Sequence, residues 1–197
     1  MLDAALAVIV DGGPRAANAS AIAAALGAPS GSIYHRFGSR DGLLAALWLR
    51  SVERFQRGFR AAVEIDDAEQ AALDAARHVF RWSRSEPAEA LLLARYRLMD
   101  LLDEPLEELP LEQLQRDDAQ RRRVALGLQS LAQRLDLDLP RVTLALVDLP
   151  LAAVRRPLTA GEPVDEALET LVLEGVQSLL KGGRRRRRRR RPNNLVS

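Results

Sequence analysis

Residues 18–44 read NASAIAAALGAPSGSIYHRFGSRDGLL, and this stretch decides the fold of the N-terminal part of the chain. The alanine-rich run over 19–26 is typical of a short helix. Asn18 is a favourable N-cap for it, because its side-chain oxygen can accept a hydrogen bond from a free backbone N–H. Gly27 can adopt the positive φ that ends a helix. The pattern therefore predicts a helix that ends in a tight glycine turn.

A second short helix is predicted directly after this turn. Pro29 can open it at the first position, where a missing N–H costs nothing. Pro29, Ile33 and Phe37 then share one face and are expected to point inward. The opposite face is small and polar. It comprises Ser30, Gly31, Ser32, Tyr34 and His35.

A long helix is predicted to follow, over residues 40–63. Ser39 can cap its start, and Asp41 lies near the positive end of its dipole. Two short helices around a glycine turn, the second with a polar outer face, are typical of a helix-turn-helix motif whose second helix enters a DNA major groove. An ordinary helical hairpin in an all-α core has the same periodicity, so the pattern alone leaves both interpretations open.

The amino-acid sequence of this stretch resembles that of the DNA-binding domain of the TetR/AcrR family of bacterial repressors. The resemblance rests on Ile22-Ala23, Gly27, the run GSIYHRF at 31–37, Ser39-Arg40 and Leu43-Leu44. It covers about the first quarter of the chain. The sequence departs from the family pattern at four positions. Asn18 replaces the usual Thr, Pro29 a frequent Ser, Ser30 a common Lys and Arg40 a Lys.

The resemblance implies roles for individual residues in DNA binding. Ser30, Gly31, Ser32 and His35 would approach base edges. Tyr34 would donate its hydroxyl to a phosphate, and Arg40 would hold another. Ser20 and the backbone near Asn18 would add phosphate contacts from the preceding helix. A serine in place of lysine at position 30 removes a strong guanine reader, so the family does not predict the half-site sequence.

The 197 residues contain 4% aromatic residues, and periodic helical segments run through most of the chain. We therefore expect an all-α protein. Its expected parts are a three-helix helix-turn-helix domain at 1–46, a larger helical ligand-binding and dimerisation domain at 47–181, and a disordered arginine-rich tail at 182–197.

Eight consecutive arginines occupy 184–191, and without them the formal net charge of +2 becomes −6. A run of like charges repels itself and is expected to stay disordered. Such a tail is either an extension without a role in sequence choice or a non-specific phosphate grip that makes binding steeply salt-dependent.

Composition excludes several kinds of site. The chain has no cysteine, so disulfides and thiolate metal sites are excluded, and we expect no metal and no cofactor. The apolar run at the N-terminus is short and contains Asp3, which argues against a signal peptide. No run is long enough to span a bilayer. A cytoplasmic protein without a membrane partner is the expectation.

The regulatory half is expected to hold a mainly apolar cavity among the helices over 68–135. Candidates for its lining are His78, Trp82, Tyr96 and Met99, although each could equally be simple core. A small apolar effector would bind there and favour a geometry that does not fit DNA. The sequence does not identify this effector.

Two strongly apolar helices are predicted near the C-terminus, over 140–156 and 164–181, the first with a kink at Pro150. Together they exceed what one small core needs, so they predict a homodimer that pairs through a four-helix bundle. The family resemblance implies the same, while an ordinary monomer core is the alternative. The candidate interface comprises Leu144, Val147, Leu151, Leu168, Val172 and Val176.

These features favour a ligand-responsive transcriptional regulator, a repressor that binds a palindromic double-stranded DNA operator as a homodimer. An enzyme is disfavoured, because two histidines, no cysteine and no Ser/His/Asp constellation leave few catalytic groups. The remaining alternative is a helical dimeric interaction module whose arginine tail binds nucleic acid non-specifically.

Overall fold

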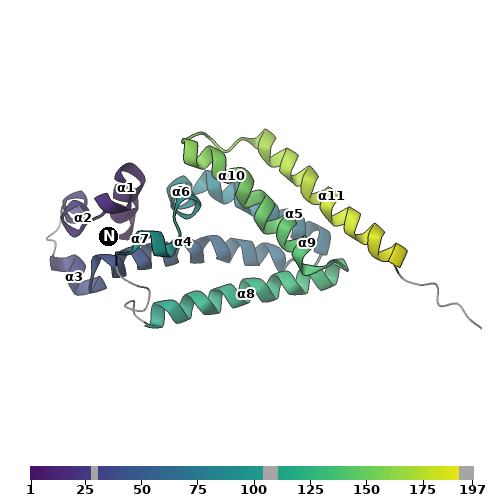
Figure 1. Ribbon diagram of the computed structural model, residues 1–197, viewed down its shortest axis with the longest axis horizontal. Helices are drawn as coiled ribbons and strands as arrows, with labels where there is room; N and C mark the ends of the chain where they lie inside the picture. The colour runs from purple at the N-terminus through teal and green to yellow at the C-terminus, as the bar shows by residue number, and fades with distance from the viewer. Residues whose placement is uncertain (28–30, 104–110, 191–197) are drawn as a thin grey trace, which may run out of the picture.

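The N-terminal helices gather at one end of the molecule, and one long helix joins them to the rest (Figure 1). The computed structural model describes residues 1–27, 31–103 and 111–190, and no strand occurs among them. The N-terminal group consists of α1 (Leu2–Gly12), a 3-10 turn (Pro14–Ala16), α2 (Ala19–Leu26) and α3 (Gly31–Phe37). The long helix is α4 (Arg40–Val63). The all-α expectation is confirmed.

The predicted caps and turns of the N-terminal group are present. The Asn18 side chain accepts a hydrogen bond from the Ala21 amide at 2.9 Å, and Ser39 Oγ accepts one from Gly42 at 3.0 Å. Gly27 ends α2 with φ of 61°. Phe37 is partly buried against the N-terminal core, as predicted. Pro29 lies outside the described residues, as does the side chain of Ile33.

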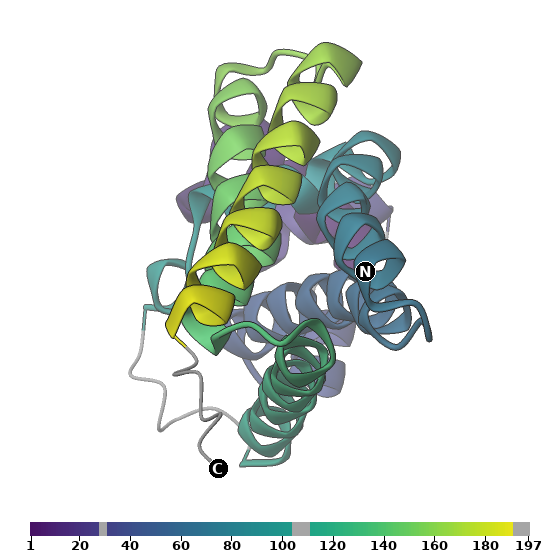
Figure 2. The same ribbon diagram turned by 90° about the vertical axis from the view of Figure 1, so that its right-hand side faces the viewer.

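The remaining helices form the body of the molecule. They are α5 (Ala68–Ser85), α6 (Pro87–Arg95), α7 (Leu98–Leu101), α8 (Leu111–Leu135), α9 (Leu139–Thr143), the π-helical turn η3 (Leu144–Asp148), α10 (Leu149–Ala160) and α11 (Glu166–Arg190). Their apolar faces meet around Phe80, Leu131 and Leu146, which are fully buried. Figure 2 shows α11 in front of α10, along one side of the body.

The segment from Pro87 to Asp103 is not one continuous helix. It breaks after Arg95, and the short α7 follows. Trp48 Nε1 donates to the Tyr96 carbonyl at 3.3 Å, and the Asp100 carboxylate accepts from the Arg97 amide at 2.7 Å. These bonds satisfy backbone groups that a continuous helix would pair internally, so α7 can start in a new direction.

Pro150 is accommodated by a local change of helix type. The Leu149 amide donates to the carbonyl of Leu144, five residues earlier, which is the π-helical pattern. Pro150 itself is buried at the start of α10. The helix also continues through Pro157 as far as Ala160, so the loop predicted over 157–163 is shorter than expected.

The last helix α11 runs to Arg190 and so enters the segment predicted to be a disordered tail, while 191–197 lie outside the described residues. Within the described part of the chain, every helix is either too short or too polar to cross a membrane.

Candidate nucleic-acid interface and effector cavity

The outer edge of α3 is the candidate surface for reading DNA. Gly31 and His35 are exposed on it, as the helix-turn-helix prediction requires. Ser30 lies outside the described residues, and so do the side chains of Ser32 and Tyr34. Their predicted roles in base and phosphate contact therefore remain predictions.

The N-terminus of α2 offers a second edge of the same surface. Ser20 is exposed in the first turn of α2, and Asn18 precedes it as the N-cap. The positive end of a helix dipole and its free amides favour a phosphate at such a position.

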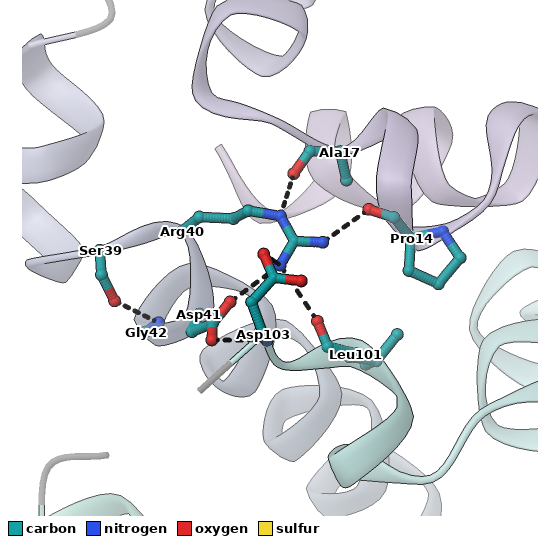
Figure 3. Close-up of polar contacts among 8 residues, drawn as sticks. All are labelled: Pro14, Ala17, Ser39, Arg40, Asp41, Gly42, Leu101 and Asp103. Atoms are coloured by element: carbon teal, nitrogen blue, oxygen red, sulfur yellow. Dashed lines mark hydrogen bonds and ion pairs between the residues drawn. The ribbon is translucent and has the colours of Figure 1, made fainter. Parts of the chain in front are cut away.

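Arg40 is placed differently from the prediction. Its guanidinium points into the molecule, and the side chain is only 17% exposed (Figure 3). Nε donates to the Ala17 carbonyl at 3.1 Å, and one terminal nitrogen donates to the Pro14 carbonyl at 2.8 Å. The other donates to Asp41 and Asp103, both at 2.8 Å, and to the Leu101 carbonyl at 3.3 Å. Arg40 therefore joins three parts of its own chain.

Two other arginines of the N-terminal group are exposed, Arg15 after α1 and Arg36 in the last turn of α3. The Arg36 guanidinium lies 5.7 Å from the centre of the Phe37 ring. Neither arginine was assigned a role from the sequence. The sequence signal that could have indicated them is the excess of basic over acidic residues in the first sixty positions.

The N-terminal group does not close its core alone. Leu92 of α6 and Leu101 of α7 are each 1% exposed and belong to the same buried cluster as Leu6 and Ile22. The boundary predicted at residue 46 therefore separates segments that share one apolar core.

A buried carboxylate reinforces the same junction. Glu89 of α6 is 2% exposed and pairs with Arg54 at 2.7 Å and Arg50 at 3.3 Å, both on α4. Arg50 also pairs with Asp3 of α1 at 2.8 Å. Three helices thus meet around one charge cluster.

A cavity of about 370 Å³ lies in the body, between α4, α5, α6, α8 and α10. Its lining is mostly apolar and includes Trp48, Phe55, Trp82, Leu93, Ala94, Leu151, Val154 and Leu158. Volume and lining fall in the usual range for a small-molecule site. The predicted helices over 68–135 supply only part of this lining, because α4 and α10, which lie outside that range, supply the rest.

One of the four predicted lining residues, Trp82, contacts this cavity. His78 packs between α4 and α5, where its Nε2 donates to the Phe55 carbonyl at 2.9 Å. Burial, as the largest effect, and the Arg81 charge lower the pKa of His78, against the raising effect of that hydrogen bond. Tyr96 packs on the N-terminal core, and Met99 is 66% exposed on α7.

The polar groups of the cavity come from four helices, because Ser83 of α5 lines it as well. Gln56 Oε1 is buried without a hydrogen-bond partner. Arg121 of α8 and Arg155 of α10 add positive charge to the lining. A buried acceptor without a partner costs free energy, so this arrangement favours a ligand that carries a polar group as well as an apolar body.

The predicted dimer residues divide into two sets. Leu144 and Leu151 are 47% and 41% exposed, and Val147 and Leu168 are partly buried. Val172 and Val176 are buried at 7% and 0% within the chain's own core, so they are not accessible to a second copy. Leu171, which was not predicted, is 65% exposed on α11.

Comparison with known proteins supports this organisation. Residues 1–47 match the family model described as bacterial regulatory proteins, tetR family. No curated protein matches the chain.

Solved structures share the fold of nearly the whole chain. The fatty acid degradation regulator FadR from Bacillus halodurans is 21% identical with a TM-score of 0.66, over 92% of this chain and 96% of that one. FadR from Bacillus subtilis, solved with stearoyl-CoA, is 18% identical with a TM-score of 0.67, over 92% and 96%. The TetR-family regulator PfmR from Thermus thermophilus is 19% identical with a TM-score of 0.66, over 91% and 96%.

Proposed function

Because residues 1–47 match the family model of the bacterial regulatory proteins, tetR family, we propose that this chain is a transcriptional repressor released from a palindromic DNA operator by a small effector. The match over these residues, on a chain whose α3 exposes Gly31 and His35, is the observation that carries the proposal. Two copies would present α3 to successive major grooves about 34–36 Å apart.

Gly31 and His35 are exposed on α3 and are proposed to approach base edges. Ser30 and Ser32 are proposed to do the same, because they occupy the neighbouring positions to which the family resemblance gives this role. Arg36 of α3 and Arg15 of the turn before α2 are exposed cations and are proposed to hold phosphates. Tyr34, Ser20 and the α2 N-terminus at Asn18 complete the proposed phosphate contacts.

The dimer is proposed to form through the exposed faces of α10 and α11. Leu144, Leu151 and Leu171 are large apolar side chains on these neighbouring helices and the turn before them, and they face solvent in the single chain. Burying them against a second copy would remove apolar surface from water. The α3 helices of the two copies would then be held at a fixed distance from each other.

The effector is proposed to be an amphiphile with an apolar body and an anionic head. Apolar side chains line most of the cavity, while Arg121 and Arg155 supply positive charge and Gln56 a polar group without a partner. A FadR with the same fold was solved with stearoyl-CoA, which is a molecule of this class.

The DNA-binding proposal is tested by selecting bound fragments from a random DNA pool at about 200 mM salt, where non-specific contacts by the arginine tail are weakened. We expect one enriched inverted repeat. On that operator, Arg36→Ala should weaken binding at all sequences and reduce the salt slope by about 1. Recovery of DNA without any enriched sequence would favour a non-specific interaction module instead.

The effector proposal is tested by intrinsic fluorescence. Both tryptophans of the chain, Trp48 and Trp82, line the cavity, so a bound ligand should change their emission. We expect stearoyl-CoA to bind, and Arg155→Gln to weaken it more than it weakens an uncharged alcohol of the same chain length. Equal affinity for stearoyl-CoA and the alcohol in the unaltered protein would refute the anionic head.

A further inference from the structure

Arg40, Asp41 and Asp103 form a polar cluster with the backbone carbonyls of Pro14, Ala17 and Leu101, here called the Arg40 cluster (Figure 3). It connects the turn before α2, the first residues of α4 and the end of α7. All three guanidinium nitrogens of Arg40 donate hydrogen bonds inside it.

Asp41 completes the cluster on the side of α7. It is 7% exposed, and one carboxylate oxygen accepts from Arg40 at 2.8 Å. Its other oxygen accepts from the Asp103 amide at 2.8 Å. The Asp103 carboxylate in turn forms an ion pair with Arg40, so the end of α7 is held by two charged residues of α4, Arg40 and Asp41.

These contacts leave Arg40 badly placed for the phosphate contact that the family resemblance implies. To reach a phosphate, the guanidinium would have to leave two carbonyls of its own domain and two carboxylates. A hydrogen bond to a charged group is worth more than one between neutral groups, and a buried acceptor left without a donor is costly. The arrangement therefore favours Arg40 staying where it is.

We propose that Arg40 is a positioning residue for DNA binding, which fixes the turn at residues 14–17 to the end of α7. This turn leads directly into Asn18 and α2, the helix that precedes the reading helix α3. The inference rests on the proposed function only in that α3 is taken to read DNA. The physical link between turn and α7 stands independently.

The position of α7 allows this link to transmit a movement of α6 to the N-terminal turn. The chain reaches α7 directly from α6, and Ala90, Leu93 and Ala94 of α6 line the cavity. A ligand that shifts α6 would move the Leu101 carbonyl and Asp103, and through Arg40 the carbonyls of the N-terminal turn. The route runs beside α4 and does not require that helix to bend or swing.

Lysine cannot replace Arg40 in this cluster. A guanidinium presents five N–H groups in a planar fork, whereas an ammonium is a compact charge with three donors at one point. The cluster spreads its acceptors over three nitrogens. A phosphate contact, by contrast, tolerates either cation, so Arg40→Lys separates the two roles.

The first test needs neither DNA nor ligand. Amide hydrogen exchange is measured at Ala16, Ala17 and Asn18 in the full chain and in Arg40→Lys and Asp103→Ala. We expect exchange there to be about tenfold faster in Arg40→Lys, and also faster in Asp103→Ala. The control is Arg57→Ala, which removes an exposed side chain of the same helix and should change nothing there. Unaltered exchange in both cluster variants would overturn the proposal.

The second test uses the selected operator. If Arg40 positions the domain, Arg40→Lys and Asp103→Ala both weaken binding, and the salt slope of Arg40→Ala stays that of the unaltered chain. If Arg40 holds a phosphate, Arg40→Lys binds normally and Arg40→Ala lowers the slope by about 1. The second result overturns the proposal. A wild-type chain that selects no operator would refute the proposed function, and the exchange experiment would then decide on Arg40 alone.

Discussion

At the scale of single residues, His78 and Gly58 show how closely α4 and α5 approach each other. A Cβ on Gly58 would lie 2.3 Å from the His78 ring, so only glycine leaves room for it. The ring in turn lies 5.2 Å from Phe55 and donates to its carbonyl. The neutral ring is favoured because burial disfavours the charged form.

The pKa of His78 predicts a dependence of stability on pH. Because this pKa is lowered in the folded chain, the unfolded chain takes up a proton first as the pH falls below about 6.5. Stability is therefore full above that pH and is lost below it. Urea unfolding at pH 7.5 and 5.5 should show a smaller loss in His78→Gln, which keeps a donor for Phe55 but does not titrate.

The second histidine provides the control for this experiment. His35 is exposed on α3, so His35→Gln should keep the pH dependence of the unaltered chain. If His78→Gln and the unaltered chain lose equal stability over this range, His78 does not carry the effect.

Gly58 gives a prediction with a matched control in another helix. Replacing glycine by alanine inside a helix normally raises the free energy of unfolding by up to about 1 kcal/mol. At Gly58 overpacking against His78 should outweigh this, so Gly58→Ala should lower the free energy of unfolding by about 1–3 kcal/mol. Gly175→Ala, whose Cβ would lie 3.6 Å from Leu149, should be neutral or stabilising. A stabilised Gly58→Ala in urea unfolding would contradict the packing of α5 on α4.

At the scale of elements, local sequence predicted the helices that carry their own start and stop signals. The start of α4 follows from Ser39, and the start and end of α2 follow from Asn18 and Gly27, all visible in the sequence. The break between α6 and α7 was not predictable in this way. It depends on Trp48 bonding to Tyr96, a contact between residues far apart in the chain.

The faces of α10 and α11 illustrate a related limit. Apolar spacing identified both helices, but it could not decide which leucines and valines face the chain's own core. Val172 and Val176 turn inward, whereas Leu171, next to Val172 in sequence, turns outward. Adjacent positions on a helix lie about 100° apart, so a small rotation of the helix decides this assignment.

This division predicts opposite effects for neighbouring substitutions in α11. Leu171→Asp should shift the chain from dimer to monomer in sedimentation equilibrium and leave the stability of the single chain nearly unchanged, because the side chain is 65% exposed. Val176→Ala should keep the dimer and lower the free energy of unfolding by about 2 kcal/mol. A dimer that survives Leu171→Asp would exclude this face of α11 as the interface.

At the scale of the whole molecule, the N-terminal domain and the body form one connected unit. Leu92 and Leu101 complete the N-terminal core, the Glu89 ion pairs join α1, α4 and α6, and the Arg40 cluster joins the turn before α2 to α7. The motif predicted the helix α3, but not this attachment, because Arg40 and Asp103 are brought together only by the tertiary fold. A molecule bound in the cavity would therefore have short physical routes to the N-terminal helices.

A change of DNA specificity on substitution of His35 tests whether α3 reads base edges. The selection from a random DNA pool is repeated with His35→Asn under the conditions used for the unaltered chain. We predict an inverted repeat of the same spacing whose base preference changes at one pair of symmetry-related positions, because Asn and His present different donors and acceptors to the major groove. Selection of the same sequence by both chains would contradict base reading by His35, and absence of any inverted repeat would contradict the account as a whole.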